Sequence, residues 1–219
     1  MSDDEWYVLA LDTETDGLPP GGEHRASRAV LDTGVERPER WPRVLQIAWV
    51  VLSRRGDIVA RRNAYIQPID MSPLNKHACA VHGISMELLK ERGENGRVVL
   101  EELDVDMRRA RLCAAHNAAF DFSMLAAEAQ RRGLRPPMCG GDIFRRVCTM
   151  SVWEHKFRRR LRLRALYSRL YAEKKEFVSL LVPDGSYHDA LVDAECAARC
   201  ARRMCAMGLL SSPPTRTHT

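Results

Sequence analysis

The sequence lacks long apolar runs and the marks of an exported protein. No stretch of its 219 residues reaches the ~18 uninterrupted apolar residues of a membrane span, so we expect no membrane partner. The N-terminal MSDDEWYVLALD is acidic and continues into a strand-like stretch, unlike a secretory signal. The seven cysteines have no paired spacing, and nothing is spaced to complete a zinc site around Cys196 and Cys200. We therefore expect reduced thiols, buried as small apolar side chains, in a cytoplasmic or nuclear protein.

The chain also lacks internal repeats and domain linkers. A hydrophobic content of 45% suits one globular domain with a full core. We expect this domain to span residues 1–210, with a long loop or insertion at 17–42 and a disordered tail at 211–219.

The pattern of apolar residues predicts three strands followed by strand–helix alternation. The first strands are expected at 6–12, 43–53 and 58–66, and the short turn at 54–57 makes the last two antiparallel. Short strands are expected at 111–116 and 147–150. Helices are expected at 85–93, 98–110, 118–132, 161–172 and 189–207. This order predicts an α/β protein with a mixed sheet and helices packed on it.

The net charge of +5 is concentrated in one segment. From Glu154 to Glu176, nine basic and three acidic residues give +6, so the remainder of the chain carries −1. A local excess of this kind fits contact with a polyanion, and an arginine-rich helix face in solvent is an equally weighted alternative.

Four carboxylates and one histidine follow or lie within apolar runs. Asp12 and Glu14 alternate along the first strand, so both project from the same face. Asp121 lies one turn into a helix, and His188 and Asp193 flank the start of the last helix. Gathered carboxylates repel one another, and oxygen ligands favour Mg²⁺ or Mn²⁺ over Zn²⁺. The set predicts metal-dependent phosphoryl transfer or hydrolysis, with His188 as proton acceptor.

Each of these signals taken alone has a simpler explanation. Asp12 and Glu14 could be solvated carboxylates at a strand end, Asp121 could interact with the helix dipole, and His188 could be a surface residue. Their joint occurrence, in order and in suitable local contexts, favours a catalytic site.

Together the segments resemble the motifs of the DEDDh (DnaQ-like) group of 3′→5′ exonucleases. DTETDGL, HNAAFD and the 188–193 His-x-x-x-x-Asp correspond to the three motifs, and LQIAWV, AVHGI and LRLRALYSRLY fit neighbouring elements. The likeness is greatest to the proofreading epsilon subunit of bacterial DNA polymerase III and its stand-alone relatives. It implies an RNase H-like fold, in which a mixed five-stranded sheet has three antiparallel first strands and helices on both faces.

The resemblance also implies a mechanism. Two Mg²⁺ or Mn²⁺ ions would be held by Asp12, Glu14, Asp121 and Asp193. His188 would take the proton of the attacking water, releasing a nucleoside 5′-monophosphate. Contact with the terminal nucleotide is expected from Thr13, Thr15, Leu18, His82, Asn117 and Phe120. Ordinary core packing is the alternative for these residues. The nucleic-acid backbone is expected to follow Lys156, Arg158, Arg159, Arg160, Arg162 and Arg164.

Two features depart from the family pattern. Asp16 stands where the family often has threonine, and the 17–41 stretch is longer than expected. Because the chain ends soon after its last helix, we expect a free-standing nuclease, with a DNA polymerase or a second copy of the chain left open as partner. Single-stranded 3′ ends, preferably of DNA, are the expected substrate. An RNA-trimming exonuclease and a non-catalytic nucleic-acid-binding module on the same fold are the alternatives.

Overall fold

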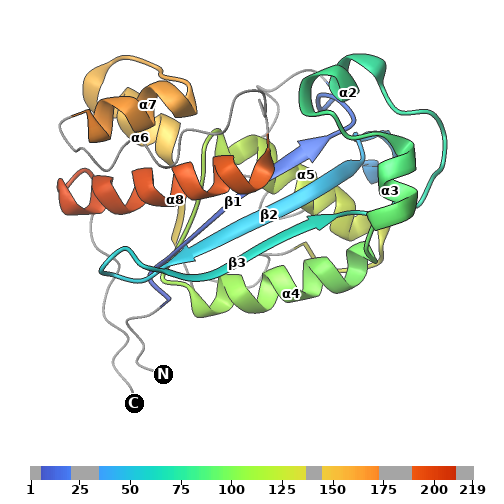
Figure 1. The fold of residues 1–219 in the computed structure, drawn as a ribbon, viewed down its shortest axis with the longest axis horizontal. Coiled ribbons are helices and arrows are strands. Elements are labelled where there is room, and N and C mark those ends of the chain that lie inside the picture. Colours follow the sequence, from blue (N-terminus) through green and yellow to red (C-terminus); the bar gives the residue numbers. More distant parts are fainter. Residues whose placement is uncertain (1–5, 21–34, 137–144, 173–188, 211–219) are drawn as a thin grey trace.

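A five-stranded sheet in the order β3-β2-β1-β4-β5 forms the centre of the protein (Figure 1). The computed structural model describes residues 6–20, 35–136, 145–172 and 189–210. β1, β2 and β3 pair antiparallel, whereas β4 pairs parallel with both β1 and β5. The mixed sheet and its antiparallel first three strands are therefore confirmed. The strands are β1 (Val8–Thr15), β2 (Val44–Leu52), β3 (Ile58–Tyr65), β4 (Leu112–Ala115) and β5 (Arg145–Cys148).

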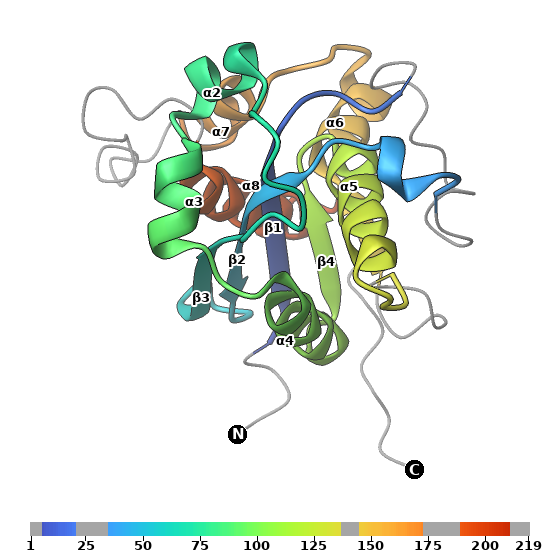
Figure 2. The same cartoon turned by 90° about the vertical axis from the view of Figure 1, so that its right-hand side faces the viewer.

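Helices cover both faces of the sheet, as predicted (Figures 1 and 2). One apolar core joins one side of the sheet to α6, α7 and α8, and a second joins the other side to α4 and α5. Within the described residues, a 3₁₀ helix, η2, spans Pro38–Arg40. The α-helices are α2 (Lys76–His82), α3 (Met86–Arg92), α4 (Gly96–Arg109), α5 (Ala118–Arg131), α6 (Thr149–Phe157), α7 (Leu163–Tyr171) and α8 (Ala190–Ala206).

Strand β1 contributes to both cores because successive side chains of a strand face opposite sides. Val8 and Ala10 pack in the core that contains α8, and the intervening leucine packs in the core that contains α5. Asp12 and Glu14 follow at the same two-residue spacing, so their side chains lie on the same face of the sheet as those of Val8 and Ala10. They therefore point toward the face that α8 covers, at the C-terminal end of the strand.

Two helices and some boundaries differ from the sequence prediction, since β1 runs from Val8 to Thr15 instead of 6–12. Neither α2 nor α6 was predicted, and residues 147–150 are not one strand, because β5 ends at Cys148 and α6 begins at Thr149. The Sγ of Cys148 accepts the N–H of Ser151 as the N-cap of α6. Cysteine is not among the residues that usually mark the start of a helix, so nothing in the sequence indicated that α6 begins after Cys148.

The remaining expectations concern cysteines, membranes and chain ends. Cys196 and Cys200 are buried free thiols, as predicted, and burial raises the pKa of Cys196 to about 12. Within the four described ranges, no helix is long and apolar enough to span a membrane. The predicted tail and most of the predicted 17–42 loop lie outside the described residues.

Candidate functional site

Strand β1 extends beyond its parallel neighbour β4, so the C-terminal end of β1 has no strand paired with it on that side. Pairing with β4 covers Val8 to Ala10, whereas pairing with β2 continues to Thr15. Beyond β4, the N–H and the hydroxyl of Thr13 donate to Oδ1 of Asp121, at 3.0 and 2.9 Å. The end of β1 is thus joined directly to the first turn of α5.

Asn117 makes the turn that brings α5 to this place. It has left-handed backbone angles (φ 70°, ψ 42°) between the end of β4 and the start of α5. Asparagine tolerates this conformation better than most residues with a side chain. One turn later, Asp121 is only 2% exposed and lies against β1.

Helix α8 brings further carboxyl groups to the same end of the sheet. Asp193 lies in its first turn, and Asp189 caps it by accepting the N–H of Leu191 at 2.8 Å. The charges of both acids raise the pKa of Glu14. Asp189 was not predicted as part of the site, although an aspartate directly before a helix is a recognisable capping signal.

The clustered carboxyl groups have raised pKa values because they are desolvated and repel one another. Burial, followed by the charges of Asp193 and Asp121, raises the pKa of Glu14 to about 8. Burial raises the pKa of Asp121 to about 7, against the opposing effect of its hydrogen bonds from Thr13. Burial and the neighbouring acids raise the pKa of Asp12 well above its usual range. Full ionisation of this cluster is therefore unfavourable unless positive charge is supplied.

The donor set fits a hard divalent cation, since all its donors are carboxylate oxygens. In the part of the chain that the structure describes, no three acidic, histidine or cysteine side chains close around a common point. Mg²⁺ often keeps several of its waters and binds to only one or two carboxylates, so a Mg²⁺ site does not require three such side chains around one point.

The residues predicted to contact a nucleotide lie on three elements. Leu18, just beyond β1, is 63% exposed, which rules out core packing for its side chain. Asn117 and Phe120 are half-buried around the start of α5. His82, at the end of α2, accepts the N–H of Ile84 on Nδ1 at 3.0 Å. Thr15 is buried, and its hydroxyl donates to the carbonyl of Gly17 at 2.8 Å.

Asp16 joins several segments through hydrogen bonds. Its Oδ2 accepts from the guanidinium of Arg43, at 2.9 Å from Nε, and its Oδ1 accepts the N–H of Asn75 at 2.6 Å. Arg43 also donates to the carbonyls of Asp70 and Ser72, at 2.8 and 2.9 Å. This network ties the end of β1 to the segment that leads into α2.

The predicted basic residues do not form one helix face. They span the end of α6, the connection to α7, and the first turn of α7, and all are exposed: Lys156, Arg158, Arg159, Arg160, Arg162 and Arg164. The connection begins at Arg158, whose φ of 55° ends α6 sharply.

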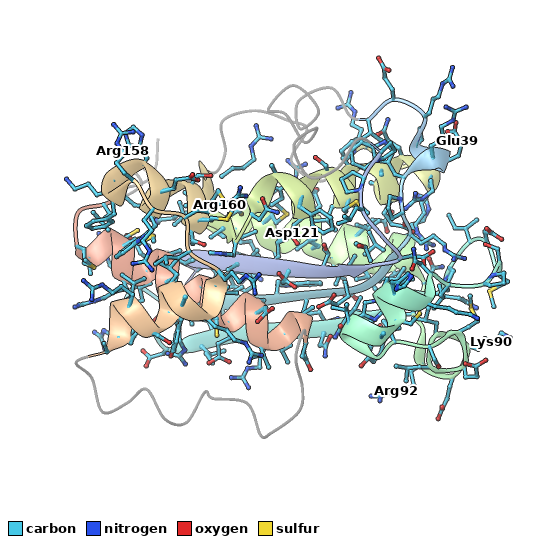
Figure 3. All side chains as sticks on the ribbon, turned by 90° about the horizontal axis from the view of Figure 1, so that it is seen from above. Glu39, Lys90, Arg92, Asp121, Arg158 and Arg160 are labelled. Carbon is cyan, nitrogen blue, oxygen red and sulfur yellow. The ribbon has the colours of Figure 1, made fainter. Side chains whose placement is uncertain are left out.

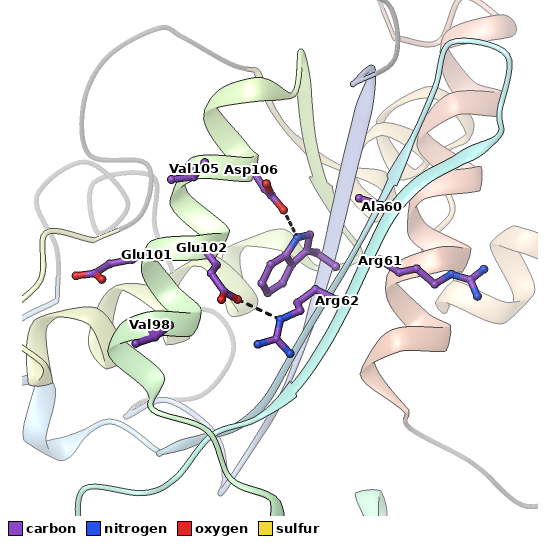
Figure 4. Close-up of a pocket in the computed structure, with 9 residues that line it drawn as sticks. Ala60, Arg61, Arg62, Val98, Glu101, Glu102, Val105 and Asp106 are labelled. Carbon is purple, nitrogen blue, oxygen red and sulfur yellow. Dashed lines mark hydrogen bonds and ion pairs between the residues drawn. The ribbon is translucent and has the colours of Figure 1, made fainter. Parts of the chain in front are cut away.

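A groove elsewhere on the protein is distinct from this cluster. It has a volume of about 460 Å³ and lies between β3 and α4 (Figure 4). Trp49 in this groove donates to Asp106, and Arg62 pairs with Glu102. Its lining includes none of the predicted site residues that the structure describes.

Of the predicted catalytic set, the fold places Asp12, Glu14, Asp121 and Asp193 close enough that the charges of Asp121 and Asp193 raise the pKa values of Asp12 and Glu14. His188 lies outside the described residues, one position before Asp189.

Residues 9–201 match the family model RNase_T, described as exonuclease. No curated protein is similar enough in sequence to count as a match. A similar structure is the nuclease domain of 3′hExo, a DEDDh family member bound to rAMP, with 16% identity, a TM-score of 0.66 and coverage of 94% of both chains. Exonuclease X in complex with 5′-overhanging duplex DNA has 20% identity and a TM-score of 0.54, over 94% of this chain and 96% of that one. Exonuclease I from Methylocaldum szegediense has 16% identity and a TM-score of 0.59, over 91% of this chain. This chain spans only 40% of that exonuclease I. These likenesses establish the RNase H-like fold.

Proposed function

Because the chain belongs to the RNase_T exonuclease family, we propose that it removes nucleotides from the 3′ end of single-stranded nucleic acid. The observation that carries this proposal is the group of Asp12, Glu14, Asp121 and Asp193 at the C-terminal end of β1, in which the acids raise the pKa values of Asp12 and Glu14. In open α/β sheets, ligands bind at the carboxyl ends of the strands, which is where this group lies.

Divalent cations are the cofactor that this group fits, and we propose two Mg²⁺ or Mn²⁺ ions held by its four carboxylates. When bound, the cations would offset the carboxylate charges and stabilise the charge that develops on the phosphoryl oxygens. Thr13 fixes the orientation of Asp121 through two hydrogen bonds to one oxygen, so this ligand is positioned before substrate arrives. In this proposal His188 accepts the proton of the attacking water, and the product is a nucleoside 5′-monophosphate.

The terminal nucleotide is proposed to lie between the end of β1 and the start of α5. Leu18 and Phe120 pack on the last bases, a contact that tolerates any sequence because every base has a π-face. The backbone around Thr13 and Thr15, together with Asn117 and His82, completes the contacts with the sugar and phosphate. The exposed basic residues from Lys156 to Arg164 contact phosphates of the remaining strand.

DNA is the proposed substrate, and RNA trimming is the second candidate. The likeness to exonuclease X, solved with duplex DNA, supports the first, and the likeness to 3′hExo, solved with rAMP, supports the second. An enzyme that selects RNA needs a contact with the 2′-hydroxyl.

The test uses DNA and RNA of one sequence, each with a blocked 3′ end, a blocked 5′ end or no block, in Mg²⁺ or Mn²⁺. The proposal expects shortening that the 3′ block stops and the 5′ block does not, with nucleoside 5′-monophosphates as products. The polymer that is shortened faster is the preferred substrate. Shortening that only the 5′ block stops would contradict the proposed polarity. Binding without any turnover would favour the non-catalytic module.

The stability of the cation-free protein is expected to fall as pH rises from about 4 to about 8. Glu14 and Asp121 have folded pKa values of about 8 and about 7, above the values near 4 of unfolded carboxyl groups. Between these limits the folded state binds more protons than the unfolded state, so each rise in pH favours unfolding. Above the folded pKa values, the stability that protonated Glu14 and Asp121 contribute has been lost completely.

Thermal unfolding in EDTA across this pH range, repeated with Mg²⁺, measures the effect. We expect Mg²⁺ to stabilise the protein far more at the alkaline end, where the carboxylates are ionised and free to bind it. Asp121→Asn should flatten the fall seen in EDTA. A Mg²⁺ effect that is equal at both ends of the range would contradict a cation site built from these carboxylates.

A further inference from the structure

His116 contacts two points of the α6–α7 stretch. It follows β4 and immediately precedes the turn at Asn117 that leads into α5. Its Nδ1 lies 2.9 Å from the hydroxyl of Thr149, the first residue of α6. Its Nε2 lies 3.1 Å from the carbonyl of Leu161, which is two residues before α7. One side chain therefore links the end of β4 to the start of α6 and to the connection between α6 and α7.

The direction of these hydrogen bonds follows from their partners. The Leu161 carbonyl can only accept, so Nε2 of His116 carries a hydrogen. Burial lowers the pKa of His116 to about 4, and the charge of Arg160 acts in the same direction. The ring is therefore neutral at physiological pH, and its Nδ1 accepts from the hydroxyl of Thr149.

The segment that His116 holds has four exposed arginines in five residues. We call residues 158–162 the arginine connection, since they include Arg158, Arg159, Arg160 and Arg162, all exposed. Arg160 is electrostatically coupled to His116, and its Nε lies 3.0 Å from the Sδ of Met150. In the view of Figure 3, Arg160 is drawn between Arg158 and Asp121.

Charge repulsion makes such a connection hard to hold in one place. Adjacent guanidinium groups repel one another, and long arginine side chains have high conformational entropy. The backbone anchor at Leu161 limits where the connection can go. His116 is only five residues from Asp121, across one turn. The hydrogen bond to Leu161 therefore sets the position of the arginine connection relative to the carboxylate cluster.

We propose that His116 is a positioning residue that fixes the arginine connection beside the carboxylate cluster, where it receives the phosphates upstream of the terminal nucleotide. The inference rests on the proposed function, because it requires a 3′ end to reach the cluster. His116 acts through the arginines and contacts neither the substrate nor the reacting atoms. It therefore affects long strands and leaves substrates without upstream phosphates unaffected.

The test compares a long single-stranded oligonucleotide with the p-nitrophenyl ester of thymidine 5′-monophosphate, which has no upstream phosphate. His116→Phe removes both hydrogen bonds, and Thr149→Val removes one. We expect His116→Phe to raise KM for the oligonucleotide roughly tenfold, as when one or two phosphates are released from the protein, with little change in kcat. Hydrolysis of the ester should stay at the wild-type rate. His116→Gln, which keeps an N–H donor for Leu161, should restore most of the affinity.

Two further variants separate positioning from general damage. Arg160→Ala combined with Arg162→Ala should reproduce the oligonucleotide defect, and adding His116→Phe to this pair should cost little more, because both changes act on the same phosphates. An equal loss on ester and oligonucleotide would overturn the inference and assign His116 a purely structural role. An unchanged KM for the oligonucleotide would also overturn it.

A binding measurement keeps the inference separate from the proposed function. If the wild-type protein hydrolyses neither substrate, the proposed function has failed, and the inference is then tested by oligonucleotide binding in EDTA. His116→Phe should weaken this binding and reduce the slope of log affinity against log salt by about one for each phosphate that the arginines no longer neutralise. A wild-type affinity and slope in this variant would overturn the inference.

Discussion

Replacing Asp12 with asparagine is expected to abolish hydrolysis of single-stranded nucleic acid while stabilising the cation-free protein at alkaline pH. The two effects have one cause. Burial and the neighbouring acids raise the pKa of Asp12, so its ionised form is unfavourable without cations. Asparagine removes the negative charge and with it the repulsion. It also removes a proposed cation ligand. If the cations then stabilise the transition state by several kcal/mol less, the reaction slows by roughly 10³-fold or more.

The control for Asp12→Asn is the same substitution at Asp104. That residue lies on α4 and pairs with Arg108 on the protein surface, 2.7 Å from its Nε. Asp104→Asn should retain full activity and, at most, lose a little stability. Unfolding in EDTA and oligonucleotide turnover in Mg²⁺ are measured on both variants. Loss of activity accompanied by loss of stability in Asp12→Asn would indicate that Asp12 supports the fold and does not serve the site.

Replacing Glu128 with alanine is expected to lower the free energy of unfolding by about 3–5 kcal/mol. Glu128 is buried on α5, where its carboxylate pairs with Arg131 and lies 2.8 Å from Nε of Arg132. The side chains of these arginines are only 13% and 10% exposed. Alanine would leave two nearly buried positive charges without their carboxylate. Removing one partner of a buried ion pair lowers stability strongly, because the remaining charge stays buried and uncompensated.

The damage should reach the segment before β2. Arg131 donates to the carbonyls of Trp41 and Pro42, at 2.8 and 2.9 Å, so the Glu128 network fixes this segment on α5. Urea unfolding measures the loss, and Glu101→Ala is the matched control because the Glu101–Arg97 pair is exposed. The control should change the stability by less than ~1 kcal/mol. Equal losses in the two variants would contradict the role given to the Glu128 network.

The sequence predicted the sheet and most helices because their apolar residues repeat at the strand and helix periods. The stripe of Leu163, Leu166, Tyr167 and Leu170 on α7 is buried as expected. Helix α2 was missed because none of its residues is buried, so it has no apolar stripe. Its end signals were present, since Asn75 caps it and Gly83 ends it at a positive φ of 73°.

The acidic part of the site was predicted because its residues follow recognisable strands and helices in the order of a known family. Interactions between distant segments left no such signal. His116 meets Leu161, 45 positions away, and Arg43 joins Asp16 to residues near α2. The folded positions of these partners depend on the tertiary structure, so spacing along the chain does not reveal them. Asp189 was missed for a different reason, since its capping role was visible but its proximity to Glu14 was not.

The most direct test of the central claim is the location of bound Mn²⁺ by its anomalous scattering in crystals of the wild-type protein with a nucleoside 5′-monophosphate. The account predicts Mn²⁺ between the carboxylates of Asp12, Glu14, Asp121 and Asp193, beside the phosphate of the nucleotide, and no Mn²⁺ there in crystals of Asp12→Asn. Nucleotide bound elsewhere, with no Mn²⁺ at these carboxylates, would contradict the account.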